Sequence, residues 1–290
     1  MNDIQLFMYL YMYGLEVFLN ENKTKFHNIE LNKDEANLDS PLKTKIKELI
    51  EESYRTYQVN DEIKNVSVIK IDGQKHEISD DIKKARIEKV ILPGDIKDEL
   101  KNILKSKKNG VYTNPDLCLK IEIAGRTEYV TIELKATKRD AILGSSVKQI
   151  DFDEWTVFFK RTKTLIKFST GRYINAINSK VRFPDRNPRP EVAFSEVESW
   201  NNNHRKIEDN TLSLSSCPEN EQKKKIINDL DNVLADRWVK ILFGEEKQRG
   251  RTPWFTCELR RFIIKFLDKY DKLPNNGKED LKKNIRSKIK

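Results

Sequence analysis

The chain has 290 residues and a mass of 34.1 kDa, a length that suits either two average domains or one elaborated α/β domain. Hydrophobic residues make up 37% and charged residues 35% of the sequence, which excludes a polytopic membrane protein and a collagenous chain. The 55 Lys and Arg residues exceed the 46 Asp and Glu residues, and the formal charge of +9 favours an anionic partner such as nucleic acid, although an A/T-rich genome would also enrich lysine.

The first part of the chain predicts helices with one short strand. Ile4 to Leu19 is the most apolar stretch, but it is too short for a comfortable membrane span and lacks the positive start of a signal peptide. It predicts a buried helix, with a subunit interface as one possible setting. Helical spacing predicts further helices over about 41–58 and over 96–104, and alternation predicts a strand over 66–71.

The segment from Leu117 to Ala136 alternates apolar and polar residues on both sides of a central turn, which predicts two antiparallel strands. If Gly125-Arg126 forms a two-residue type II′ turn, Asp116 lies opposite Lys135. Glu133 is then the diagonal neighbour of Asp116 across the strands. Because strand side chains alternate between faces, all three charged residues are expected on one polar face of the hairpin.

The rest of the chain is predicted to pass from strands to helices. Strands are expected at 155–159 and 192–194, and a helical face recurs over 226–242. A last helix is predicted to open at Thr252-Pro253. The Lys-rich end after Leu273 is predicted to be frayed.

Cysteine and histidine usage gives no sign of a soft-ligand metal site. The three cysteines stand far apart with no CxxC pair, so neither a disulfide framework nor a thiolate zinc site is indicated. The three histidines show no HxH or HExxH spacing. A reducing, cytoplasmic compartment fits this usage best, with no membrane partner.

Pro115-Asp116 and Glu133-Leu134-Lys135 form the motif that carries chemistry. Together they resemble the PD-(D/E)XK signature of the nuclease superfamily that includes most type II restriction endonucleases. The acidic-x-Lys triplet occurs nine times in this Lys-rich chain, so the triplet alone has no weight. Only the copy at Glu133 both follows a Pro-Asp at a suitable distance and ends a predicted strand.

The resemblance implies a fold and a domain organisation. It implies an α/β restriction-endonuclease-like fold, in which a mixed central β-sheet carries the catalytic hairpin and helices flank the sheet. We expect one elaborated catalytic domain over residues 1–290. Its parts are a mainly helical region over 1–105, the PD-(D/E)XK core over 106–200, and a helical region over 201–290.

The resemblance also implies phosphodiester hydrolysis that depends on Mg²⁺. Asp116 and Glu133 would hold the ion, with the Leu134 carbonyl as a third ligand and Glu122 in reserve. Lys135 would orient the attacking water and stabilise the developing charge. The competing interpretation is an amphipathic hairpin with a charged outer face, in which Asp116 and Lys135 form a surface ion pair.

Candidate DNA contacts are polar residues on expected loops and just beyond the motif, and for each of them a solvated surface side chain is the competing interpretation. The candidates are Lys138, Arg139, Gln149, Arg172, Arg186, Arg189, Arg249 and Arg251.

The function predicted from these observations is that of a type II restriction endonuclease, cutting double-stranded DNA at a specific site. One site cuts one strand, so a homodimer is expected, and a cognate DNA methyltransferase is expected in the same restriction-modification system. The alternatives are a structure-specific or repair nuclease with the same motif, and a basic DNA-binding protein without catalysis.

Overall fold

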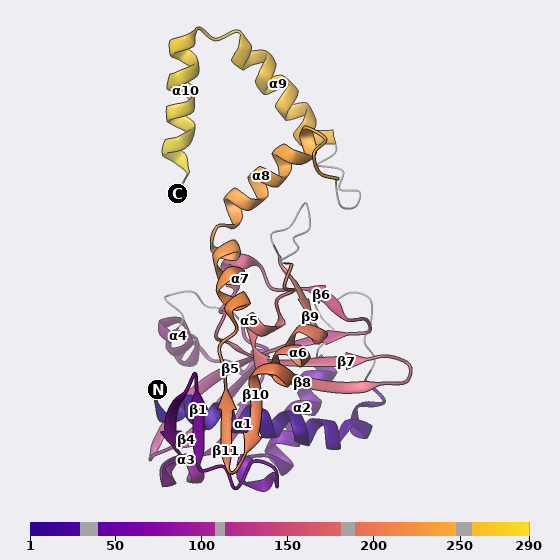
Figure 1. The fold of residues 1–290 in the computed structure, drawn as a ribbon, viewed down its shortest axis with the longest axis vertical. Coiled ribbons are helices and arrows are strands. Elements are labelled where there is room, and N and C mark those ends of the chain that lie inside the picture. Colours follow the sequence, from indigo (N-terminus) through magenta and orange to yellow (C-terminus); the bar gives the residue numbers. More distant parts are fainter. Residues whose placement is uncertain (30–39, 108–113, 181–188, 248–256, 290) are drawn as a thin grey trace. The chain divides into compact units, whose positions relative to one another are not determined.

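The computed structural model describes residues 1–29, 40–107, 114–180, 189–247 and 257–289 (Figure 1). These residues divide into two compact units, one that ends at Leu230 and one that begins at Asp231. The first unit is a mixed α/β structure and the second consists of helices. Among the described residues, no helix has both the length and the apolar character needed to cross a membrane.

A five-stranded mixed sheet forms the centre of the first unit, with the order β3-β4-β5-β7-β8. Strands β5 and β7 are parallel, and the other neighbours are antiparallel. The prediction of an α/β fold with a mixed sheet is therefore confirmed. The strands are β3 (Arg86–Ile91), β4 (Leu117–Ile123), β5 (Arg126–Thr137), β7 (Trp155–Arg161) and β8 (Ile166–Arg172).

Two smaller sheets complete the β structure. One has the order β10-β11-β1-β2, with β1 parallel to β11, and the other pairs β6 with β9. The predicted strand over 66–71 corresponds to β1 and ends at a turn in which Asp72 and Gly73 have φ values of 48° and 88°. The strands are β1 (Val68–Ile71), β2 (Gln74–Glu77), β6 (Ala141–Leu143), β9 (Glu191–Ala193), β10 (Arg205–Glu208) and β11 (Thr211–Leu214).

The helices surround the sheets in the first unit and make up the second. In the first unit they are α1 (Asp3–Glu21), α2 (Ser40–Ser53), α3 (Asp80–Lys84), α4 (Asp98–Lys107), α5 (Tyr173–Ala176), α6 (Phe194–His204) and α7 (Pro218–Asn228), with 3-10 turns η1 (Lys23–Phe26), η2 (Tyr57–Val59), η3 (Pro93–Asp95) and η4 (Val147–Gln149). In the second they are α8 (Leu230–Leu242), α9 (Leu259–Asp271) and α10 (Asn275–Lys288).

The C-terminal region differs from the prediction in two ways. The Lys-rich end forms α10, so the prediction of a frayed tail is wrong, and the predicted helical face over 226–242 is divided between α7 and α8. The expected helix start at Thr252-Pro253 lies outside the described residues. Strands also occur within both flanking regions, since β1 to β3 precede residue 105 and β10 and β11 follow residue 201.

Helix α1 is the buried helix predicted from the apolar N-terminus. Phe7, Tyr11 and Leu15 are all 0% exposed within the core of the first unit. A Cβ at Gly14 would meet the Tyr54 hydroxyl at 2.0 Å, so only glycine allows α1 to approach this close to Tyr54. Most apolar side chains of α1 are buried by their own chain, and a subunit interface at α1 stays a prediction.

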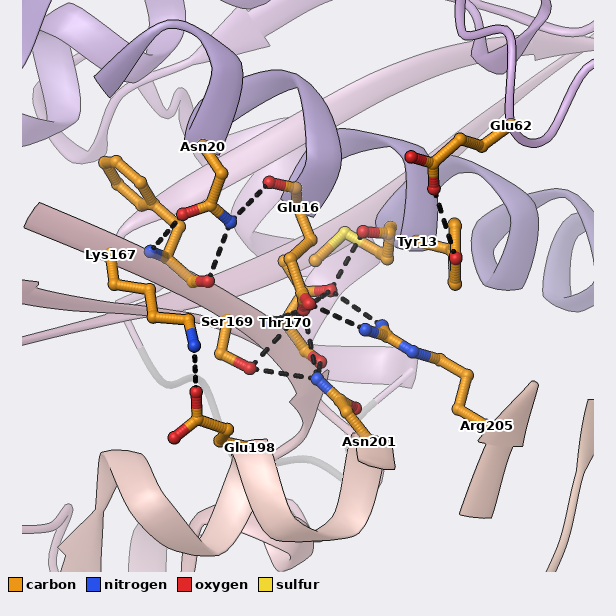
Figure 2. A network of polar contacts seen from close by, with 12 residues as sticks. Tyr13, Glu16, Asn20, Glu62, Lys167, Ser169, Thr170, Glu198, Asn201 and Arg205 are labelled. Atoms are coloured by element: carbon orange, nitrogen blue, oxygen red, sulfur yellow. Dashed lines mark hydrogen bonds and ion pairs between the residues drawn. The ribbon is translucent and has the colours of Figure 1, made fainter. Parts of the chain in front are cut away.

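A carboxylate on α1 joins this helix to both main sheets (Figure 2). Glu16 Oε2 accepts hydrogen bonds from Thr170 N on β8 at 2.5 Å and from Asn201 Nδ2 on α6 at 3.0 Å. Its Oε1 accepts from Arg205 on β10 at 2.7 Å. Because β8 and β10 belong to different sheets, one charged group links the five-stranded sheet to the four-stranded one.

Replacing Glu16 by Gln should lower the free energy of unfolding by about 3 kcal/mol, because a mostly buried cation would lose its partner. Arg205 is only 11% exposed and keeps its charge in the variant. Urea unfolding followed by circular dichroism measures the change. Glu198→Gln is the control, since its ion pair with Lys167 has side chains 35% and 45% exposed. A loss no larger than that of the control would contradict a stabilising role for the charge.

Candidate functional site

The turn of the β4–β5 hairpin sets the geometry of the site, and it differs from the prediction. Leu117 pairs with Ile132 and Ile123 with Arg126, so the central turn residues are Ala124 and Gly125. Their φ values of 50° and 70° are both positive, as in a type I′ turn, whose twist matches that of the flanking strands. The predicted type II′ turn at Gly125-Arg126 is therefore wrong.

The observed register changes which residues face one another but not which face of the sheet they occupy. Leu117 faces Ile132, so its predecessor Asp116 lies across from Glu133 rather than Lys135. The shift is by two positions, and side chains alternate with a period of two, so the predicted division into an apolar and a polar face is confirmed. Leu117 and Leu134 point into the core, while Glu133 and Lys135 share the opposite face.

The three motif residues come together at this face. Lys135 Nζ lies 2.7 Å from Glu133 Oε1, and Asp116 Oδ2 accepts a hydrogen bond from Leu134 N at 2.7 Å. The side chains of Asp116, Glu133 and Lys135 are 16%, 17% and 12% exposed. Asp116 and Lys135 do not form an exposed ion pair. Asp116 pairs with a different lysine, Lys135 pairs with Glu133, and the side chains of all three motif residues are mostly buried.

The charged partner of Asp116 is Lys43, which no motif or spacing in the sequence singles out. Its Nζ lies 2.8 Å from Asp116 Oδ1, and its side chain is 20% exposed. It belongs to α2, a helix distant in sequence from the hairpin. The packing of α2 beside β3 brings it to the site, and no local spacing rule could have predicted this contact.

Ser145 and Tyr173 support Glu133 from the other side. Ser145 Oγ donates to Glu133 Oε1 at 3.0 Å, and Ser145 N donates to the Tyr173 hydroxyl at 2.7 Å. The preceding Gly144 is required, because a Cβ there would meet the Tyr173 hydroxyl at 2.6 Å. Lys135 Nζ also lies 5.8 Å from the centre of the Tyr173 ring. The orientation of Glu133 and Lys135 is thus set by neighbours in the loop after β6 and on α5.

Burial and crowding perturb both kinds of charge at the site. Burial and the nearby negative charge of Glu133 raise the pKa of Asp116 to about 6, although Lys43 and the Leu134 N–H oppose the shift. Burial lowers the pKa of Lys135, but the adjacent Glu133 carboxylate outweighs this effect and holds that pKa above its usual value. Lys135 is therefore an ammonium group at neutral pH.

The donor set fits a magnesium ion with two protein carboxylates. Among the described residues, no group of three or more His, Cys, Asp or Glu side chains is arranged so that it could hold a metal ion. Asp116 and Glu133 supply two hard oxygen ligands, and Mg²⁺ is commonly held by one or two carboxylates together with several waters. Mg²⁺ stays a prediction, as does the Leu134 carbonyl as a ligand. Glu122 is not part of this set, because its carboxylate pairs with Arg86 at 2.8 Å and is 47% exposed.

The candidate DNA contacts fall into three groups. Lys138, Arg139, Gln149 and Arg189 are exposed, the first two immediately after β5 and Gln149 in η4. Arg172 is engaged elsewhere, since its guanidinium donates to the Asp153 carbonyl and lies 3.8 Å from the centre of the Trp155 ring. The remaining candidates, Arg186, Arg249 and Arg251, lie outside the described residues.

The strand predicted at 155–159 follows the hairpin as β7, parallel to β5. Between β5 and β7 the chain forms β6 and the three-residue 3-10 turn η4.

No family model matches this sequence, and no curated protein matches it. Any function therefore has to be argued from the residues and their geometry.

As the pH rises from about 4 to about 7.5, the free energy of unfolding of the metal-free Asp116→Asn variant should increase relative to that of the wild type. The pKa of this carboxyl is about 6 in the folded chain against an ordinary 3.8, so the folded state binds more protons in this interval and loses stability as the pH rises. Urea unfolding in a chelator at both pH values measures the difference.

Asp140→Asn is the matched control for this pH dependence. Hydrogen bonds from Ser195 and Lys160 lower the pKa of Asp140 despite its partial burial, so its stabilising effect is lost only at still lower pH. The difference between Asp140→Asn and the wild type should stay flat over the same interval. A flat difference for Asp116→Asn as well would show that its carboxyl titrates normally.

Proposed function

We propose that this chain is a Mg²⁺-dependent type II restriction endonuclease that hydrolyses double-stranded DNA at a specific sequence. The observation that carries the proposal is the convergence of Asp116, Glu133 and Lys135 on one polar face, with 2.7 Å between the lysine ammonium and the glutamate. Two carboxylates beside a buried ammonium group are the set that the PD-(D/E)XK resemblance requires. The mixed sheet with β5 parallel to β7 is compatible with a restriction-endonuclease-like fold, which we propose on the same grounds.

Each residue of the set has a definable role in phosphodiester hydrolysis. Mg²⁺, held by Asp116 and Glu133, would supply Lewis-acid polarisation of the phosphate and of the attacking water. The Leu134 N–H fixes Asp116, and the Ser145 hydroxyl fixes Glu133, so both carboxylates are preorganised. Lys135 keeps its proton and can stabilise negative charge that develops on the phosphate.

The surroundings of the set suit a DNA substrate. Lys138 and Arg139 are exposed and directly follow β5, the strand that carries Glu133 and Lys135. We propose that they contact backbone phosphates beside the site. The net charge of +9 favours association with a polyanion. We propose a cytoplasmic enzyme whose host DNA is protected by a methyltransferase of the same restriction-modification system.

A homodimer is part of the proposal, because one active site cuts one strand and a two-fold pair cuts both. Most of α1 is buried in its own core, whereas the helices of the second unit carry exposed apolar side chains. On α9, Ile264 and Leu267 lie three residues apart on the same side of the helix and are 60% and 46% exposed. We propose that two copies associate through this face of α9.

Lys135→Ala should separate DNA binding from cleavage. The lysine acts on charge that develops in the transition state, so DNA affinity should stay within a few fold while cleavage falls by about a hundredfold or more. Single-turnover cleavage of a bound oligonucleotide measures the chemical step. Lys120→Ala is the control, since this lysine lies on β4 and pairs with Glu88, away from the motif. Wild-type cleavage by folded Lys135→Ala would contradict the proposed active site.

Ile264→Asp combined with Leu267→Asp should convert a dimer into a monomer. Charged side chains cannot be buried in an apolar interface without a partner, so association should weaken by about a hundredfold or more. Sedimentation equilibrium of the full chain measures the mass. Val59→Asp is the control, because Val59 is an equally exposed apolar residue, 57% exposed, on η2. A wild-type monomer, both free and on DNA, would refute the dimer.

A further inference from the structure

Lys43 holds the position on Asp116 that a metal ion would need. The Asp116 Oδ2 atom accepts the Leu134 N–H of the sheet at 2.7 Å, so this oxygen is fixed by backbone. The other oxygen, Oδ1, faces the Lys43 ammonium at 2.8 Å. Of these two partners only the lysine can move away, because its ammonium ends a flexible four-carbon stem and is 20% exposed.

The helix that carries Lys43 does not itself favour a cation at this place. Lys43 lies in the first turn of α2, where the helix dipole favours negative charge and where this helix has no acidic residue. The neighbouring Leu42 and Ile46 are both 0% exposed and lock α2 into the core. The lysine is thus held next to Asp116 by packing, against the local electrostatic preference of its helix.

Lys43 also completes the charge balance of the site. Two carboxylates, Asp116 and Glu133, lie beside two ammonium groups, Lys43 and Lys135, so the ionised cluster is neutral without a metal. A divalent cation that enters while Lys43 remains would create an excess of two positive charges in a mostly buried space. Such an excess is costly where the dielectric is low.

We propose that Lys43 is an internal counter-cation that competes with the divalent metal for Asp116 Oδ1, so that the DNA-free protein binds metal weakly. The inference rests on the proposed metal-dependent function and assigns Lys43 as a positioning residue of that site. When metal enters, the ammonium leaves Oδ1 and turns to solvent or to a DNA phosphate. Metal and DNA binding are thereby coupled through one side chain.

The test is Mn²⁺ binding to the full-length protein without DNA, measured by the loss of the free-ion signal in electron paramagnetic resonance. A neighbouring cation lowers the proton affinity of a carboxylate by about one to three pKa units, so Lys43→Met should tighten Mn²⁺ binding by about tenfold or more. Lys45→Met is the matched control, because Lys45 lies on the same helix and pairs with Glu48 at 3.0 Å. An unchanged or weaker affinity for Lys43→Met would overturn the inference.

A second measurement uses the wild-type protein and so does not depend on the folding of a variant. Mg²⁺ should make Lys43 several times more reactive toward an amine-acylating reagent, read by peptide mass spectrometry, while Lys45 stays constant. Mn²⁺ binding to Asp116→Asn distinguishes a failure of the proposed function from a failure of the inference about Lys43. If wild type and Lys43→Met both bind no Mn²⁺, the proposed function fails together with the inference. If Asp116→Asn abolishes binding but Lys43→Met equals the wild type, only the inference about Lys43 fails.

Discussion

The pairing of β4 with β5 is the constraint on which the rest of the site depends. The turn at Ala124 and Gly125 sets this pairing, and with it the position of Asp116 across from Glu133. The hydrogen bond from Leu134 N to Asp116 Oδ2 then ties the entry of β4 to the middle of the acidic-x-Lys triplet. A change of one residue in register would turn Glu133 and Lys135 into the core, so the site exists only in this pairing.

Burial makes the charges of the site interdependent. Two carboxylates lie close together in a partly dehydrated space, which raises the pKa of Asp116, and each is matched with a lysine. A surface cluster would show little of this coupling, because solvent screens exposed charges. Burial of these charges costs free energy in the metal-free chain, and a divalent cation would add to that cost unless Lys43 leaves the site. Clustered charge of this kind is more typical of a functional site than of a stabilising ion pair.

The sequence predicted those parts of the fold and site that depend on local periodicity. The hairpin, its two faces, the strand at β1 and the buried N-terminal helix all follow from spacing and turn residues. The division into faces survived an incorrect turn type because a shift of two residues leaves strand faces unchanged. Lys43, Ser145 and Tyr173 could not be predicted, since packing between elements that are distant in sequence brings them to the hairpin. The helix α10 was missed because charge-rich composition gives a weak signal when no apolar stripe must be buried.

The most direct test of a metal-dependent nuclease is digestion of long double-stranded DNA by the purified full chain, with Mg²⁺ and with a chelator. The proposed function predicts discrete fragments only when Mg²⁺ is present, with one common sequence at the fragment ends. DNA that remains intact with Mg²⁺ but shifts on a gel would contradict catalysis and identify a DNA-binding protein whose hairpin is charged without being an active site.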